Sequence, residues 1–121
     1  MGTGTSSYTF TSVQEHKAPH TTSTLTIKGA LADQAKLKSN ALIKVYKGCN
    51  AVQASQVNKN LLLSPGARAL SIPKLEIETD DVQCRHDATI GKLNAEQLFY
   101  LQSRGLSHAQ AQHDLVEAFL G

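Results

Sequence analysis

A chain of 121 residues is long enough for one domain with a single core and too short for two. Its 40% hydrophobic and 18% charged residues are typical of a globular protein, but no apolar run approaches the roughly 20 residues of a membrane helix. Together with a net charge of +2 and no run of Lys or Arg, this composition predicts neither a membrane nor a nucleic-acid partner.

The first ten residues are small and polar at their start, and we expect a flexible lead-in over residues 1–10. Beyond it, apolar pairs recur at a regular interval that shortens only before the last pair: Leu25 and Ile27, Ile43 and Val45, Leu61 and Leu63, Leu75 and Ile77. A period of this length with short alternating strands is typical of a solenoid. Residues 11–92 are therefore predicted to form a parallel β-helix in which each apolar pair stacks on the next.

The alternative all-β fold is a sandwich built from hairpins. Hairpins favour Asn-Gly or Asp-Gly turns, and the chain contains neither dipeptide. The solenoid is therefore preferred. Short polar residues are assigned to its corners and strand approaches, where they can satisfy bent backbone: Asn40, Asn50, Asn58, Asn60 and Ser64.

The segment 75–91 alternates like a strand and places Cys84 and His86 two residues apart on one face. A thiolate and an imidazole can hold iron or zinc, but a complete site needs three or four ligands, so a metal role would be shared with a partner. The alternative is that both side chains pack inward as small core residues. Cys49 follows Gly48 at a turn and is assigned no chemistry.

Residues 93–121 change to a helical period and are assigned to a helical hairpin that caps one end of the solenoid. Asn94 and Ser107 are N-cap residues, each with Gln three positions on, so helices are predicted over 94–104 and 107–120.

Three consecutive apolar residues in the first helix point in different directions: Phe99, Tyr100 and Leu101. They cannot all pack on one surface. We therefore expect at least one of Phe99 and Tyr100 to stay exposed as an apolar anchor for a partner protein.

Five longer motifs occur in order along the chain: Gln14-x-His16-x-Ala18-Pro19-His20-Thr-Thr-Ser23, Lys28-Gly-Ala-Leu31, Asn58-Lys-Asn-Leu-Leu-Leu-Ser64, Leu75-Glu-Ile-Glu-x-Asp-Asp-Val82-x-Cys84-x-His86 and Gln97-Leu-Phe-Tyr-Leu-Gln-Ser-Arg-Gly105. The series resembles the C-terminal half of the SufB/SufD family of iron–sulfur cluster assembly scaffolds, the SufD branch in particular. The resemblance covers residues 8–121.

This resemblance implies a right-handed parallel β-helix followed by an αα-hairpin, and a non-catalytic scaffold rather than an enzyme. It implies a SufB-like scaffold as partner at the β-helix end and a SufC-like ABC ATPase on the C-terminal helices. No firmly bound cofactor is expected, only a transient iron–sulfur cluster at a subunit interface. Family members are several times longer, so we expect a domain excised from a longer protein, with self-association through the open β-helix end.

Cys84 and His86 match the family's Cys-x-His motif, whose histidine is implicated in cluster formation. The match also carries over the residues of the segment that docks the ATPase: Gln97, Leu98, Phe99, Tyr100, Leu101, Arg104 and Gly105. Asp87 stands where the family usually has Gly. A carboxylate beside the imidazole would favour its protonated form, which competes with metal binding.

Two other classes of function remain open. A carbohydrate-active β-solenoid enzyme would use the acidic face of Glu76, Glu78 and Asp80, but sugar platforms need exposed Trp or Tyr, and the chain has no Trp and three Tyr. A purely structural interaction module would bind the ATPase without needing Cys84 or His86. The signatures of phosphate-loop NTPases, HExxH peptidases and GxSxG hydrolases are absent. Two cysteines without a CxxC spacing predict a reducing compartment, the cytoplasm or, in a plant or alga, the plastid stroma.

Overall fold

The computed structural model describes every residue, Met1–Gly121, as six strands followed by two helices. The elements are β1 (Ser7–His16), β2 (Thr22–Leu31), β3 (Lys36–Val45), β4 (Val52–Leu62), β5 (Arg68–Ile77), β6 (Val82–Lys92), α1 (Ala95–Ser103) and α2 (His108–Leu120). The expected lead-in is shorter than predicted. Strand β1 already begins at Ser7, and Gly2 forms a parallel bridge with Leu31.

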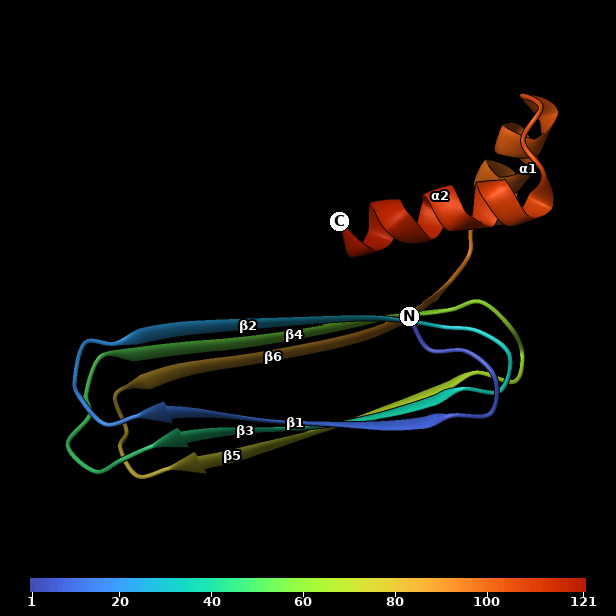
Figure 1. Cartoon of the computed structure of the whole chain (residues 1–121). Helices are drawn as coiled ribbons and strands as arrows, with labels where there is room; N and C mark the ends of the chain where they lie inside the picture. Colours follow the sequence, from blue (N-terminus) through green and yellow to red (C-terminus); the bar gives the residue numbers. More distant parts are fainter.

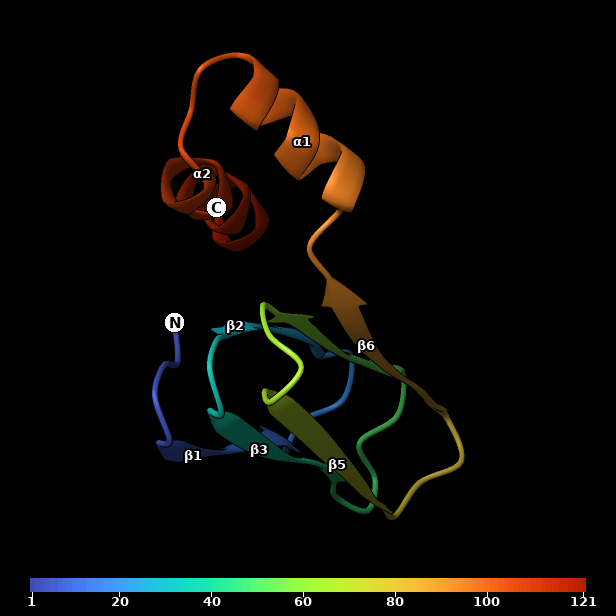
Figure 2. The ribbon, with the colours of Figure 1, turned by 90° about the vertical axis from the view of Figure 1, so that its right-hand side faces the viewer.

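The strands form two three-stranded parallel sheets in which consecutive strands never pair. Their orders are β1-β3-β5 and β2-β4-β6, so the chain crosses to the other sheet after every strand (Figure 1). Figure 2, which looks along the strands, shows the two sheets as facing layers. Each coil of the chain therefore comprises two strands, one in each sheet. The parallel pairing rules out the sandwich of antiparallel hairpins.

The stacking register differs from the prediction. Hydrogen-bonded partners always lie on strands that are separated in the chain by a strand of the other sheet, as Ser7 with Lys36 and Lys36 with Arg68 show. The interval between the apolar pairs of the sequence instead separates consecutive strands, which belong to opposite sheets. The expectation that each apolar pair stacks on the next is therefore wrong: Ile43, for example, stacks on Leu75.

The core lies between the two sheets and is densest in the middle coil. Alternate residues of β3 and β4 point inward and are buried: Ser39, Ala41, Ile43, Val45, Val52, Ala54, Gln56, Asn58 and Asn60. A middle coil has a neighbour on either side, so its inward side chains lose their contact with water. Strands β5 and β6, with a coil on one side only, have no buried residue.

Two of the asparagines assigned to corners lie in this core instead. Asn58 and Asn60 fall on the inward face of β4, where Asn60 Nδ2 donates to Asn58 Oδ1 at 3.0 Å. Strand alternation explains this placement, because both residues share the parity of Val52. Asn40 lies within β3, whereas Asn50 and Ser64 do lie at corners between strands.

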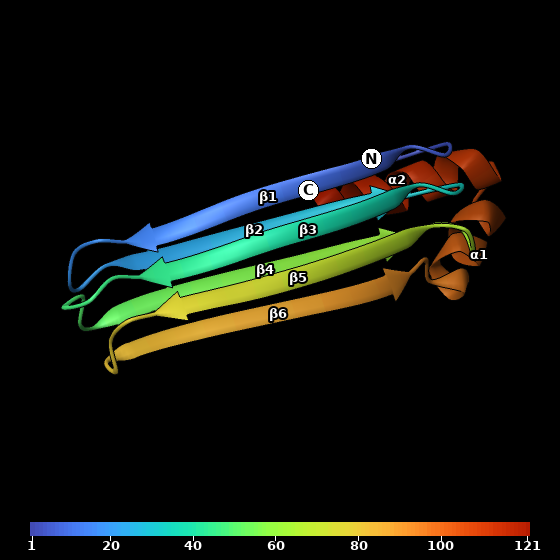
Figure 3. The same ribbon diagram turned by 90° about the horizontal axis from the view of Figure 1, so that it is seen from below.

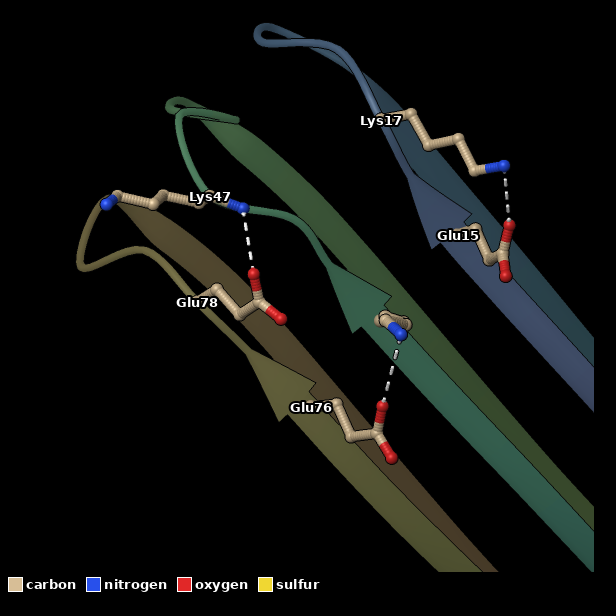
Figure 4. A network of polar contacts seen from close by, with 6 residues as sticks. Glu15, Lys17, Lys47, Glu76 and Glu78 are labelled. Carbon is tan, nitrogen blue, oxygen red and sulfur yellow. Dashed lines mark hydrogen bonds and ion pairs between the residues drawn. The ribbon is translucent and has the colours of Figure 1, made fainter.

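Acidic side chains hold the corners of neighbouring coils together. Asp33 accepts a hydrogen bond from the backbone N–H of Gly4 at 2.8 Å, and Asp81 accepts one from Ala51 at 3.1 Å. Glu78 accepts the N–H of Lys47 at 3.3 Å, a contact drawn in Figure 4. These carboxylates satisfy N–H groups that a corner removes from the sheet ladder.

The two predicted helices are confirmed, with both N-caps. Asn94 Oδ1 accepts from the backbone N–H groups of Glu96 and Gln97 at 2.9 and 3.0 Å, and Ser107 Oγ accepts from Gln110 at 3.1 Å. Neither helix combines the length and the hydrophobicity that a membrane-spanning helix requires.

Helix α2 packs on the outer face of the sheet β2-β4-β6 (Figure 1) and not on an end of the coil stack. Buried Val116 contacts Ala30 and Leu61, which point outward from β2 and β4. The prediction that the helices cap an end of the solenoid is therefore wrong. The outward apolar residues of β2 and β4 form the surface that α2 covers. The ends of the stack lie elsewhere: Figure 3 shows β1 and β6 at its two margins.

Candidate functional site

Cys84 and His86 share the inward face of β6. In the ladder between β4 and β6, Cys84 is the partner of Ala54 and His86 is the partner of Gln56. Both β4 residues are buried between the sheets, so their partners on β6 point the same way. The thiol and the imidazole are thus brought to one face by strand alternation.

The same two side chains are only half-buried, because β5 and β6 form the last coil of the stack. We call the inward face of these two strands the open end. Apolar residues at the open end are exposed although they point inward: Leu75, Ile77 and Ile90. Cys84 and His86 therefore point into the coil and are at the same time accessible at its last strand.

The surroundings of Cys84 favour its protonated form. Its side chain packs against the buried cluster of Ile43, Val45, Cys49, Val52 and Ala54. This partial burial raises the pKa of the Cys84 thiol above its ordinary value, because desolvation disfavours the thiolate. Cys84 and Cys49 are both free thiols. The thiolate is the metal-binding form, so a metal ion that binds Cys84 displaces its proton.

Asp87 does not lie beside the imidazole of His86. Residues 85 and 87 have the opposite parity and point outward, where Arg85 Nε donates to Asp87 Oδ2 at 2.9 Å. The expectation that this carboxylate lies beside the imidazole is therefore wrong. Side chains one residue apart on a strand occupy opposite faces of the sheet, and Asp87 has its own cation there.

The open end brings together two potential metal ligands, Cys84 and His86. No group of three or more His, Cys, Asp or Glu side chains gathers anywhere in the molecule. A thiol with an imidazole is nevertheless a donor pair found at iron–sulfur centres, where Cys dominates and His replaces it in some clusters. By itself the pair supplies fewer ligands than the three or four that a complete site requires.

The segment that the family resemblance implies as a docking surface, residues 97–105, lies in α1 and the turn that follows it. Helix α1 has no buried residue; Leu98 and Leu101 are half-buried against their surroundings. Phe99 is 74% exposed and Tyr100 is 54% exposed, so both aromatic rings, and not only one, face solvent. Arg104 lies over the ring of Tyr100, 5.1 Å from its centroid.

The rest of this segment shapes the turn. Gly105 follows α1 with a φ of 98°, a left-handed conformation that glycine adopts without strain. Gln97, near the start of the helix, donates its backbone N–H to Asn94. The segment therefore presents a local aromatic surface. It starts beyond Lys92 at the far end of β6 from Cys84, so the two candidate surfaces are separate.

The acidic face has structural contacts. Glu76 pairs with Lys44 Nζ on the neighbouring strand at 3.8 Å, and Glu78 holds the backbone of Lys47 (Figure 4). Glu76 thus links β5 to β3, and Glu78 links the corner after β5 to the corner after β3. Asp80 lies in the corner between β5 and β6. This arrangement favours a structural role for the strip over acid–base catalysis.

One residue at the site was not singled out from the sequence. Gln56 lies directly beside His86 in the ladder, although the whole of β5 separates the two in the chain. The sequence did contain a signal: in Val52-x-Ala54-x-Gln56 a polar residue follows two apolar ones at the spacing of side chains on one strand face. That signal has no meaning without the stacking register, which local sequence does not reveal.

Comparison with known proteins places the chain among similar sequences. The family model described as "SUF system FeS cluster assembly, SufBD core domain" matches residues 1–119. An iron–sulfur cluster assembly SufBD family protein of Synechocystis is 38% identical over 103 residues, which are 85% of this chain and 23% of that protein. The iron–sulfur cluster assembly protein SufD of Escherichia coli is 38% identical over 92 residues, 76% of this chain and 22% of that protein.

A further SufBD family protein, from Mycobacterium leprae, is 37% identical over 115 residues, 88% of this chain and 29% of that protein. The chain thus spans less than a third of the length of each of these three relatives.

Proposed function

Since this chain belongs to the SufBD family of iron–sulfur cluster assembly proteins, we propose that it acts as the core of a SufD-like scaffold subunit in the SUF machinery. The observation that carries the proposal is the position of Cys84 and His86, side by side on the inward face of the last strand at the open end. A scaffold that stacks its own last coil against this end would complete the ligand set. The cluster is then cargo held between two subunits.

We propose a right-handed parallel β-helix as the full description of the coil. Its support is the pair of parallel sheets together with the crossing from one sheet to the other after each strand. Right-handed crossover between parallel strands is by far the commoner hand.

The proposed partners use different surfaces. A SufB-like scaffold would cover the exposed Leu75, Ile77 and Ile90 at the open end, and a SufC-like ATPase would bind Phe99 and Tyr100 on α1. Only residues 93 and 94 separate β6 from α1. A movement of α1 driven by the nucleotide cycle of the ATPase therefore acts directly on the strand that carries Cys84 and His86.

In this proposal the chain itself is non-catalytic and cytoplasmic, and ATP hydrolysis belongs to the ATPase subunit. Cys84 contributes a thiolate once iron displaces its proton, and His86 contributes a neutral ring nitrogen. Neither residue transforms a substrate. Their task is to hold a nascent cluster while the second scaffold supplies further ligands, and to release it when the interface shifts.

The test is substitution of His86 in the assembled system. With the SufB-like scaffold and the ATPase present, His86→Ala should lower cluster formation from iron and sulfide by at least about tenfold. Mutating a residue that only hydrogen-bonds a metal ligand already weakens metal binding by about that factor, and loss of the ligand itself should weaken it at least as much. Anaerobic absorption spectra report the cluster, and size-exclusion chromatography reports the complex, which should stay intact.

His113→Ala is the matched control, since His113 lies exposed on α2 and pairs only with Glu117 on the same helix. It should leave cluster formation unchanged. Equal cluster yields from the wild type and His86→Ala, with an intact complex, would reject the site and leave a purely structural interaction module.

A further inference from the structure

Gln56 is the most unusual polar residue of the core. It is 2% exposed on the inward face of β4, and neither its Nε2 nor its Oε1 has a hydrogen-bond partner. Buried amides are nearly always paired in native proteins, so an amide with both ends free calls for an explanation.

The neighbours of Gln56 within its sheet leave one candidate partner. On one side its ladder partner is Leu25 of β2, which has no polar side-chain atom; on the other it is His86 of β6. The next inward residue along β4, Asn58, is already engaged: its Nδ2 donates to Ser71 Oγ at 3.2 Å, and its Oδ1 accepts from Asn60. Among these neighbours, His86 is the polar one whose side chain makes no hydrogen bond. Across the core, Gln14 Oε1 is also buried without a partner, but its Nε2 already donates to Ser23 Oγ and Ser55 O.

The distance suits a side-chain contact. Strands that pair in a sheet lie about 4.8 Å apart, and side chains in register on one face stack at that spacing. A glutamine amide and an imidazole so placed can form a hydrogen bond after rotation of the half-buried His86 ring.

We propose that Gln56 is a positioning residue for His86: its amide bonds one ring nitrogen and leaves the other, unprotonated, directed out of the open end. The proposal rests on the function proposed above and adds a residue to the same site. When Oε1 accepts from a ring N–H, the opposite nitrogen must carry the lone pair in the neutral imidazole, which is the form that binds a metal. Histidine ligands usually have their second nitrogen held in this way.

The test compares Gln56→Leu with Gln53→Leu. Gln53 lies on the same strand, is exposed and points outward, where its partner is Gln83. Nitrogen-15 spectra of the imidazole should show one predominant tautomer of His86 in the wild type and in Gln53→Leu. Gln56→Leu should shift the tautomer ratio toward that of a histidine in the unfolded chain, because the amide no longer selects one ring nitrogen.

A second readout is zinc titration followed at the ring nitrogens of His86. Loss of the supporting hydrogen bond should weaken the apparent affinity by about tenfold. Gln56→Leu should fold, since it buries an apolar side chain beside Leu25 and Ala54 and removes an unpaired amide. If that variant does not fold, Gln56→Met, which keeps the length of the side chain, gives the same comparison.

An unchanged tautomer and an unchanged zinc affinity in Gln56→Leu would overturn the proposal. That outcome can be told apart from failure of the proposed function. If His86→Ala abolishes cluster formation while Gln56→Leu leaves the tautomer unaltered, only the role of Gln56 is lost. If His86→Ala has no effect on cluster formation, the proposed site itself is rejected.

Discussion

At the scale of single residues, the exposure of a side chain follows from its coil more than from its type. Val52 and Val82 occupy equivalent inward positions on β4 and β6, yet Val52 is buried and Val82 is half-buried. Cys84 and His86 owe their accessibility to the same circumstance. A thiol in the middle coil would be inert packing, as Cys49 is in the core cluster.

The protonation of Cys84 gives a prediction at this scale. Burial raises the pKa of the thiol, so thiolate-dependent alkylation should begin at higher pH in the folded chain than in urea-unfolded chain. The rate of reaction with iodoacetamide, followed against pH in Cys49→Ala so that one thiol remains, measures this difference. Coincident pH midpoints for folded and unfolded chain would contradict it.

The same shift has a defined sign for stability. Because the folded-state pKa of Cys84 lies above the unfolded one, its contribution to the free energy of unfolding is complete below the unfolded pKa. The contribution is lost as pH rises through the folded-state pKa. Alkaline solution should therefore lower the free energy of unfolding through this thiol.

At the scale of elements, the two helices differ in what holds them. Helix α2 buries Ala111 and Val116, the latter against the sheet, whereas α1 buries no residue. An element without buried residues contributes little to the free energy of unfolding, and its exposed apolar side chains are available for a partner. The low burial and exposed aromatic rings of α1 are the basis on which we propose it as a docking surface.

Phe99→Ala tests this assignment. Binding of the SufC-like ATPase should weaken by at least about tenfold, as for an aromatic anchor at the centre of an interface. The free energy of unfolding should change by less than about 0.5 kcal/mol, because the ring is 74% exposed. Affinity is measured by surface plasmon resonance and stability by urea denaturation.

Leu98→Ala provides the converse case on the same helix. Leu98 is half-buried, so its truncation should lower stability more than that of Phe99. A Phe99→Ala variant that binds the ATPase like the wild type would show that the docking surface lies elsewhere.

At the scale of the whole molecule, the coil stack exposes inward-pointing apolar side chains at both margins. Tyr8 and Phe10 are exposed on β1, and Leu75 and Ile77 on β5. Edge strands of this kind, with free N–H and C=O groups beside apolar side chains, pair readily with another chain. The chain by itself should therefore associate with a second copy in a concentration-dependent way.

Two leucines on β5 allow the open end and the outer face of the sheet to be tested independently. Leu75, at 52% exposure, points inward beside Ile43, whereas Leu70, at 56%, points outward beside Lys38. Sedimentation velocity should show that Leu75→Lys shifts the chain to monomer while Leu70→Lys does not, since a charge at the open end opposes stacking. Equal association of both variants would place the contact on another surface; circular dichroism verifies that each remains folded.

Local sequence determined a large part of this protein. Strand alternation put Cys84 and His86 on one face, and the N-caps Asn94 and Ser107 marked both helices, because these features depend on neighbours close by in the chain. That at least one of Phe99 and Tyr100 stays exposed also followed from helical geometry; the structure exposes both. In each case the deciding interactions lie within one element.

Only the tertiary structure decided which residues stack. The offset between stacked partners is the summed length of two strands and two corners, and corners vary in length, so no local pattern reports it. That offset sets Gln56 beside His86, and the outward apolar residues of β2 and β4 draw α2 away from the end of the stack. Both outcomes depend on contacts between segments distant in the chain, whose free energy is shared over many residues and is specified by no single one of them.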